Sequence, residues 1–202
     1  VTDVPSDRWS VKRFYHSDSK IPGKTYMKRG SFLKESMQEF EPLFFGISPR
    51  EAASMDPQQR LLLEVAWEAI EDGGLNLKSL HGSRTGVFVG SFSLDALATS
   101  ASPLNREIIR DHFAATATSV TMLSARISHV FGLCGPSLSI DTACSSSLVS
   151  IHQACVSLIT GESNIAIAGG GECDVQPSDS NRYVERAFFS TRWCFKKLRC
   201  RS

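Results

Sequence analysis

Two periods of apolar residues alternate along the chain and predict the order of its elements. Apolar side chains at helical spacing predict three long helices and a short one: 57–72, 118–132, 144–161 and 105–113. Short apolar runs bounded by turn residues predict three buried strands: 85–91, 136–143 and 164–170. The last three elements follow the order strand, helix, strand, which implies a parallel pair joined by a right-handed crossover. The pattern therefore predicts an α/β fold.

Two of the helix starts carry strong capping signals. Ser48 and Asp56 are each followed by a proline, and each has a Glu or Gln three residues later. Before them, residues 1–47 show neither the helical nor the strand period. We expect that segment to be an extended surface stretch that packs a few aromatic side chains, Tyr26 among them, on a core formed elsewhere.

Charge and composition exclude several classes of partner. The 202 residues include 22 Lys and Arg against 21 Asp and Glu, so no net charge points to nucleic acid or an anionic membrane. The longest apolar runs are far too short to span a bilayer, and the first residues contain no apolar signal core. We therefore expect a cytoplasmic protein without a membrane or nucleic-acid partner.

The six cysteines show no spacing typical of a metal site or a redox pair. We expect no bound metal, no bound cofactor and no disulfide framework. Each cysteine is expected to be a small buried residue unless its neighbourhood argues otherwise, and Cys134 falls in a loop or at the entry to a strand.

Cys144 has such a neighbourhood, because it lies where a predicted strand turns directly into a helix. This turn projects side chains from the carboxyl end of a sheet, where open α/β folds bind their ligands. The unpaired amides at the helix start favour a thiolate and could stabilise an oxyanion. Ser145, Ser146 and Ser147 are small enough to let a substrate approach, and they can hydrogen-bond the first-turn amides. The local pattern fits a nucleophile, and it fits equally a buried structural cysteine with capping serines.

The second cysteine of the same segment, Cys155, falls inside the predicted helix. Apolar residues flank it at helical spacing, and a desolvated thiol far from free amides is a poor nucleophile. We expect Cys155 to be a core residue. His129 and His152 lie on predicted helices with no carboxylate at a catalytic spacing, and no papain-type motif supports a cysteine hydrolase.

The segments DTACSSSL and MDPQQR are specific enough to suggest a family. Together with GVFVGS and IAIAGG, they resemble the β-ketoacyl synthase domain of modular type I polyketide synthases, in its N-terminal half. The resemblance covers about residues 3–170. It implies an incomplete thiolase-type fold, the N-terminal half of a five-layered αβαβα architecture that is a homodimer in the full-length parent.

The resemblance also implies a reaction for Cys144. The cysteine of the DTACSSS motif takes an acyl chain from the phosphopantetheine thiol of an acyl carrier protein, so that phosphopantetheine is a substrate carrier and not a bound cofactor. A malonyl-type extender is then decarboxylated, and its carbanion attacks the acyl thioester. The Cys144 amide would contribute to the oxyanion hole.

Two features depart from the family. Its two catalytic histidines belong to H-G-T-G-T and N-x-G-H segments that do not occur here, so no histidine is carried over and the chain alone is expected to lack condensation activity. The alternative function is an inactive or non-condensing fragment that at most accepts acyl groups or binds carrier protein. We expect residues 1–170 to be a partial ketosynthase N-terminal domain, trimmed at both ends. Residues 171–202 would be a degraded or frame-shifted continuation, since a one-base shift can turn Gly171–Val175 into the family's V-N-V-M.

Overall fold

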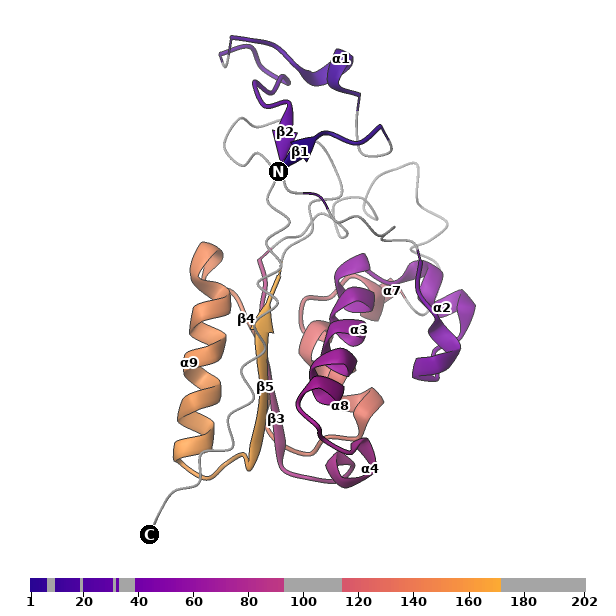
Figure 1. The fold of residues 1–202 in the computed structure, drawn as a ribbon, viewed down its shortest axis with the longest axis vertical. Helices are drawn as coiled ribbons and strands as arrows, with labels where there is room; N and C mark the ends of the chain where they lie inside the picture. The colour runs from indigo at the N-terminus through magenta and orange to yellow at the C-terminus, as the bar shows by residue number, and fades with distance from the viewer. Residues whose placement is uncertain (7–9, 19, 31, 33–38, 93–113, 172–202) are drawn as a thin grey trace.

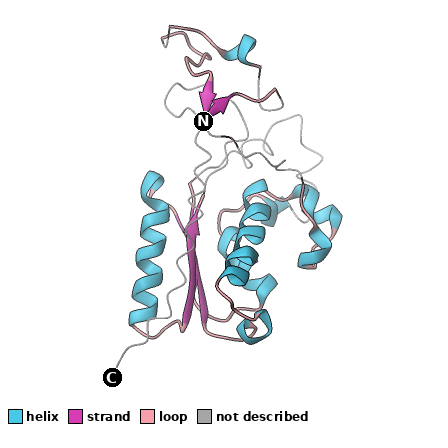
Figure 2. Cartoon of the chain, in the orientation of Figure 1, coloured by secondary structure: helices cyan, strands magenta, loops and turns pink. Residues whose placement is uncertain are grey.

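A three-stranded parallel sheet with helices on both faces forms the centre of the molecule (Figures 1 and 2). The computed structural model describes residues 1–6, 10–18, 20–30, 32, 39–92 and 114–171. The strands are β3 (Thr85–Gly90), β4 (Ser137–Ile140) and β5 (Ile165–Gly170). Helix α9 (Ser146–Ile159) covers one face, and α3 (Pro57–Asp72) and α8 (Met122–Phe131) cover the other. The predicted α/β class is confirmed.

The order of the strands differs from the expected one. The strand–helix–strand unit was expected to give a neighbouring pair, but β3 lies between β4 and β5 and is parallel to both. All six residues of β3 are buried, so this strand requires neighbours on both sides and a helix layer on both faces. Helix α9 (14 residues) packs on β3 through Phe88 and Ala154, so the connection from β4 to β5 passes over the strand between them.

Two hydrophobic clusters fill the space between the sheet and its helices. Val87 and Val89 point into the larger cluster with residues of α3 and α8, whereas Phe88 points to the other face and meets Ala154 of α9. This division follows from the alternation of side chains along a strand. The large cluster holds α3 and α8 in place, while α9 sits on a small cluster made mostly of alanines.

The predicted caps and helix limits agree closely with the structure. The Glu51 amide donates to Ser48 Oγ at 3.2 Å at the start of α2 (Pro49–Ser54). The Gln58 amide donates to Asp56 Oδ1 at 2.8 Å at the start of α3, which has the predicted limits. Helix α8 begins four residues later than expected, and the helix predicted over 105–113 lies outside the described residues.

The remaining elements are short. They are β1 (Thr2–Asp3), α1 (Val11–Phe14), β2 (Arg29–Gly30), η1 (Pro42–Phe45), α4 (Leu77–Leu80) and α7 (Ala114–Ala117). None of the described residues up to Gly30 belongs to either cluster, and Tyr26 is 49% exposed, so the expected docking of Tyr26 on the core is wrong. Among the described helices, none is long and apolar enough to cross a membrane.

Candidate active site

Cys144 lies at the carboxyl edge of the sheet, in the short connection between β4 and α9. The register pairs Gly90 with both Ile140 and Gly170, so the three parallel strands end at the same level. The chain leaves β4 at Ile140 and passes through a single 3₁₀ turn, η3 (Ala143–Ser145), before α9 begins. Cys144 is in this turn and is exposed to solvent. The helix was expected to begin at Cys144 itself, but α9 begins two residues later.

The residue before the cysteine has an unusual backbone. Ala143 has φ +54°, and it is the only non-glycine residue with a positive φ in the described part of the chain. This left-handed conformation is unfavourable for any residue with a Cβ. It lets the chain reverse sharply between strand and helix, and it puts Cys144 at the outside of the bend.

Side-chain hydrogen bonds hold this bend. The Ala143 amide donates to Asp141 Oδ1 at 3.0 Å, and Ser146 Oγ donates to the Ala143 carbonyl at 2.7 Å. Ser146 Oγ also accepts from the Thr142 amide at 2.9 Å. Ser145 Oγ donates to the Thr142 carbonyl at 2.8 Å, so it also binds a residue that precedes it in the chain. The serines were expected to bind the first-turn amides of the helix, but the hydroxyls of Ser145 and Ser146 bind the residues that precede Cys144.

Two glycines allow the start of α9 to contact the sheet directly. A Cβ on Gly90 would lie 2.4 Å from the Ser146 carbonyl carbon and 2.6 Å from the Ser147 amide nitrogen. A Cβ on Gly170 would lie 2.4 Å from the Gly90 carbonyl oxygen and 3.0 Å from Ser147 Cβ. One turn further along the helix, Ser150 Oγ donates to the Gly169 carbonyl at 2.9 Å. The close approach fixes the first turns of α9 against β3 and β5.

The backbone amide of Cys144 is available to a ligand. Among the described residues it donates no hydrogen bond, although its neighbours on both sides do. An exposed thiol with an unpaired amide on the same residue can bind a carbonyl group during attack, since an oxyanion needs backbone donors at that point.

Cys155 contradicts its prediction, because it is exposed. The face of α9 that packs on the sheet consists of small residues: Ser146, Ser150, Ala154 and Ser157. Ile151 and Leu158 pack partly against the small cluster, but other large apolar residues lie on the outer face, where Leu148 is 71% and Ile159 is 67% exposed. The glycines in the strands bring the helix axis close to the sheet, and only small side chains fit in between. The apolar pattern therefore assigned Cys155 to the wrong face.

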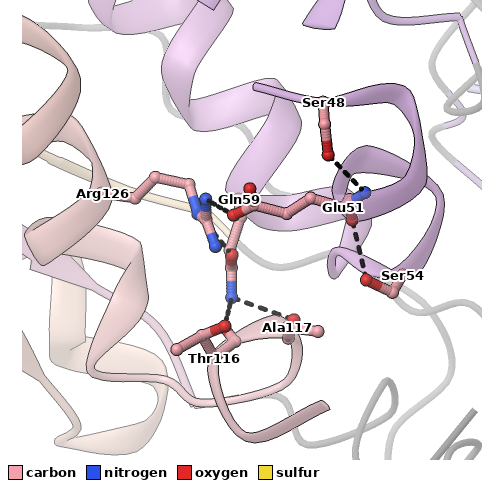
Figure 3. A network of polar contacts seen from close by, with 7 residues as sticks. All are labelled: Ser48, Glu51, Ser54, Gln59, Thr116, Ala117 and Arg126. Atoms are coloured by element: carbon pink, nitrogen blue, oxygen red, sulfur yellow. Dashed lines mark hydrogen bonds and ion pairs between the residues drawn. The ribbon is translucent and has the colours of Figure 1, made fainter. Parts of the chain in front are cut away.

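The MDPQQR segment forms a buried polar network on the side of the sheet opposite α9 (Figure 3). Gln59 Nε2 donates to the carbonyl groups of Thr116 and Ala117, both at 3.0 Å. Arg126 of α8 donates from Nε to Gln59 Oε1 at 2.9 Å and from Nη1 to Glu51 Oε1 at 2.6 Å. The Arg126 side chain is 7% exposed and that of Glu51 is 23% exposed, so the network joins α2, α3, α7 and α8 at a largely buried place.

The same segment also reaches the edge of the sheet on which Cys144 lies. Gln58 Nε2 donates to Asp56 Oδ2 at 3.2 Å, and Gln58 Oε1 accepts from Ser91 Oγ at 3.2 Å. Ser91 follows β3 directly, and its amide donates to the Ile140 carbonyl at 3.1 Å. A continuous chain of hydrogen bonds thus connects the start of α3 to the last residue of the strand that leads to the cysteine.

Two charged groups on α3 are perturbed by burial. Burial lowers the pKa of Arg60, against the opposing effect of the Asp56 and Glu64 carboxylates. Burial raises the pKa of Glu64, and the Glu68 carboxylate adds to that rise. Within the described part of the chain, Arg60 Nε is buried without a hydrogen-bond partner. Both groups lie on α3, which covers the face of the sheet opposite α9, and we assign them no part in the site.

The other sequence candidates lie apart from the bend. Cys134 lies in the loop between α8 and β4, as expected, but it is exposed and not buried. His129 and His152 are exposed on α8 and α9. Over the described ranges, no three His, Cys, Asp or Glu side chains come together as a metal site would require. Sequence reasoning missed Asp141, whose only signal was its place in the DTACSSS motif, and it gave Ser146 the wrong hydrogen-bond partners.

Comparison with known proteins agrees with this architecture. The family described as "Beta-ketoacyl synthase, N-terminal domain" matches residues 1–199. A mycocerosic acid synthase-like polyketide synthase of Mycolicibacterium smegmatis is 45% identical over 177 residues, which are 88% of this chain and 8% of that protein. Erythronolide synthase EryA2 of Saccharopolyspora erythraea is 47% identical over 171 residues, which are 84% of this chain and 5% of that protein. The chain therefore spans a small part of these relatives.

Solved structures give the same result. A ketosynthase domain of the oxazolomycin synthase from Streptomyces albus superposes with a TM-score of 0.77 at 39% identity, over 87% of this chain and 30% of that one. A ketosynthase from module 6 of the bacillaene synthase of Bacillus subtilis superposes with a TM-score of 0.67 at 33% identity, over 87% of this chain and 27% of that one. The expected thiolase-type fold, present in part, is confirmed, and the chain belongs to the β-ketoacyl synthase family, whose N-terminal domain it matches.

Proposed function

We propose that Cys144 is the acyl-accepting nucleophile of a polyketide chain-elongating enzyme. One observation carries the proposal: in a chain that matches the ketosynthase N-terminal domain, this thiol is exposed at the carboxyl edge of the sheet, on the bend that precedes α9. Covalent catalysis requires such an accessible sulfur beside backbone donors that can receive developing charge.

The first step is a transthioesterification. The Cys144 sulfur, as thiolate, attacks the carbonyl carbon of an acyl group carried on the phosphopantetheine thiol of an acyl carrier protein. The Cys144 amide, which donates to no other group in the described part of the chain, donates to the oxyanion of the tetrahedral intermediate. The intermediate collapses with loss of the carrier thiolate, which takes up a proton, and the acyl chain remains on Cys144 as a thioester.

The second step belongs to the complete protein. A malonyl-type extender on a carrier loses its carboxyl group as CO₂, and the carbanion attacks the acyl-Cys144 carbonyl. Cys144 leaves as thiolate, and a β-ketoacyl carrier is the product. We assign this step to the whole homodimeric enzyme acting in the cytoplasm. The three described cysteines are unpaired, as a reducing compartment would keep them.

Acylation of the 202-residue chain tests the first step. The chain is incubated with a hexanoyl thioester of N-acetylcysteamine, a small mimic of the phosphopantetheine arm, and the cysteine-containing peptides are mapped by mass spectrometry. We expect the acyl group on Cys144, unchanged labelling in Cys155→Ala and none in Cys144→Ala. Acylation at Cys155 instead, or none at all in a chain shown to be folded by circular dichroism, would contradict the proposal.

Alkylation of the two thiols gives a second test. Cys144 and Cys155 are both exposed, so their rates of reaction with iodoacetamide compare local environments and not accessibility. We expect Cys144 to react faster near neutral pH, because it lies beside the N-terminus of α9, whose positive end favours a thiolate, whereas Cys155 lies inside the helix. Equal rates in a folded sample would remove the argument for an activated thiol.

A further inference from the structure

We propose that Asp141 and Ser146 are positioning residues for Cys144, because they hold both polar backbone groups of the left-handed Ala143 that precedes it. The Ala143 amide donates to Asp141 Oδ1 at 3.0 Å, and the Ala143 carbonyl accepts from Ser146 Oγ at 2.7 Å. The inference rests on the proposed nucleophilic role of Cys144 and assigns a task to two side chains that touch no substrate.

The bend needs such restraints because its conformation is intrinsically unfavourable. A non-glycine residue with φ +54° persists only where the surroundings determine it. Without both bonds, Ala143 could relax to negative φ, and the direction in which the chain presents Cys144 would change. Ser145 adds a bond to Thr142 but makes none to Ala143. The Ser146 backbone amide also donates to the Ala143 carbonyl, so the side-chain restraint on Ala143 comes from Asp141 and the Ser146 hydroxyl.

Ser146 is suited to this role because the sheet fixes its backbone. Its residue is 4% exposed, and a Cβ on Gly90 would lie within 2.5 Å of its carbonyl group, so there is no free space between α9 and β3 there. The hydroxyl reaches back from this anchored position, donating to Ala143 and accepting from the Thr142 amide. Ser146 therefore connects the sheet to Ala143, the residue next to Cys144.

Two substitutions of Asp141 distinguish the effect of its hydrogen bond from the effect of its negative charge. Asp141→Asn keeps an oxygen that can accept from the Ala143 amide but removes the negative charge, whereas Asp141→Ala removes both. Because Asp141 is exposed, neither change threatens the core. In the 202-residue chain, we expect the ratio of the iodoacetamide rates of Cys144 and Cys155 to fall about fivefold in Asp141→Ala, the factor typical of one lost hydrogen bond, and to be retained in Asp141→Asn.

Ser150 provides the matched control for Ser146. Both are buried serines on the same face of α9, but Ser150 Oγ binds Ser147 and Gly169 and not the bend. We expect the rate ratio to fall at least fivefold in Ser146→Ala and to stay within twofold of the wild type in Ser150→Ala. A merely structural loss would change the local environment of the bend to the same extent in both variants, so Ser146→Ala and Ser150→Ala would give the same rate ratio.

The outcomes separate this inference from the proposed function. An unchanged ratio in both Asp141→Ala and Ser146→Ala, or an equal fall in Ser146→Ala and Ser150→Ala, would overturn the positioning role. A wild-type chain that is folded but not acylated by the hexanoyl thioester would refute the proposed function, while a ratio that still falls in Asp141→Ala would leave the positioning role standing.

Discussion

Replacing Gly90 by alanine should move the bend that bears Cys144, because the added Cβ would press on Ser146. Gly90 is the last residue of β3, and the added Cβ would lie 2.4 Å from the Ser146 carbonyl carbon, 2.5 Å from its oxygen and 2.6 Å from the Ser147 nitrogen. All three atoms are backbone, so no side chain can rotate away. The only way to make room is for the start of α9 to retreat from the sheet.

The size of the effect follows from these distances. Non-bonded carbon atoms rest about 3.5–4.0 Å apart, so the first turn of α9 would have to move by about 1 Å. Overpacking of this kind costs about 1–3 kcal/mol, and we expect a value near the upper end because backbone is displaced. A displacement of about 1 Å in a catalytic group can reduce a rate by about 100-fold. We therefore expect acylation of Cys144 to fall far more than stability alone would explain.

Gly86→Ala is the matched control on the same strand. Its Cβ would meet Ser163 Oγ at 2.5 Å and the Phe88 ring at 2.7 Å, at the opposite end of β3, about 13 Å from Gly90. Urea unfolding followed by circular dichroism measures the stability of both variants, and mass spectrometry measures hexanoyl transfer to Cys144. We expect both variants to lose stability and only Gly90→Ala to lose acylation. A Gly90→Ala chain with wild-type acylation, or equal losses in both variants, would refute the reasoning.

Three further changes test other parts of the structure. Glu51→Ala leaves the buried guanidinium of Arg126 without its carboxylate, so the unfolding free energy from urea titration should fall by about 3 kcal/mol, and a loss below about 1 kcal/mol would contradict the buried pairing. Because burial raises the pKa of Glu64, the folded state binds that proton more tightly than the unfolded state, and stability falls as pH rises from the unfolded pKa through the folded one. Glu64→Gln should therefore flatten the pH dependence of unfolding in that window and gain less than about 1 kcal/mol at neutral pH; an unchanged slope would count against it. Leu148→Lys, on the exposed apolar face of α9, should reduce aggregation measured by light scattering without shifting the unfolding midpoint, whereas a lower midpoint would mean that Leu148 is packed.

The elements with strong local signals could be predicted from the sequence. The Asp56 cap, the proline after it and a wide apolar stripe determine α3, and its observed limits match the prediction. The strand runs were equally clear because β3 and β5 are nearly continuous apolar segments. These signals are local in the chain, so they do not depend on what the element packs against.

The arrangement of the elements required the structure. Nothing in the order strand, helix, strand shows that β3 lies between the two strands, since β3 is separated from them by more than forty residues of intervening chain. The predicted buried face of α9 was wrong for a related reason: the glycines at the ends of β3 and β5 bring the helix close to the sheet, and its fully buried residues are serines and an alanine. A prediction based on hydrophobicity alone places the serine-rich face of α9 at the surface and Cys155 in the core.

The two most specific motifs of the sequence meet at one edge of the sheet, which gives a physical reason for both. Gln58 of MDPQQR binds the Ser91 hydroxyl, and the Ser91 amide binds the carbonyl of Ile140, the residue immediately before DTACSSS. The bend at Ala143 is thus held on one side by a strand whose end is tied to α3, and on the other by Ser146, which is packed against β3. The nucleophilic role proposed for Cys144 requires a thiol held in one orientation, and here backbone and short polar side chains hold it. Most positions of DTACSSS around Cys144 thus serve to hold the bend.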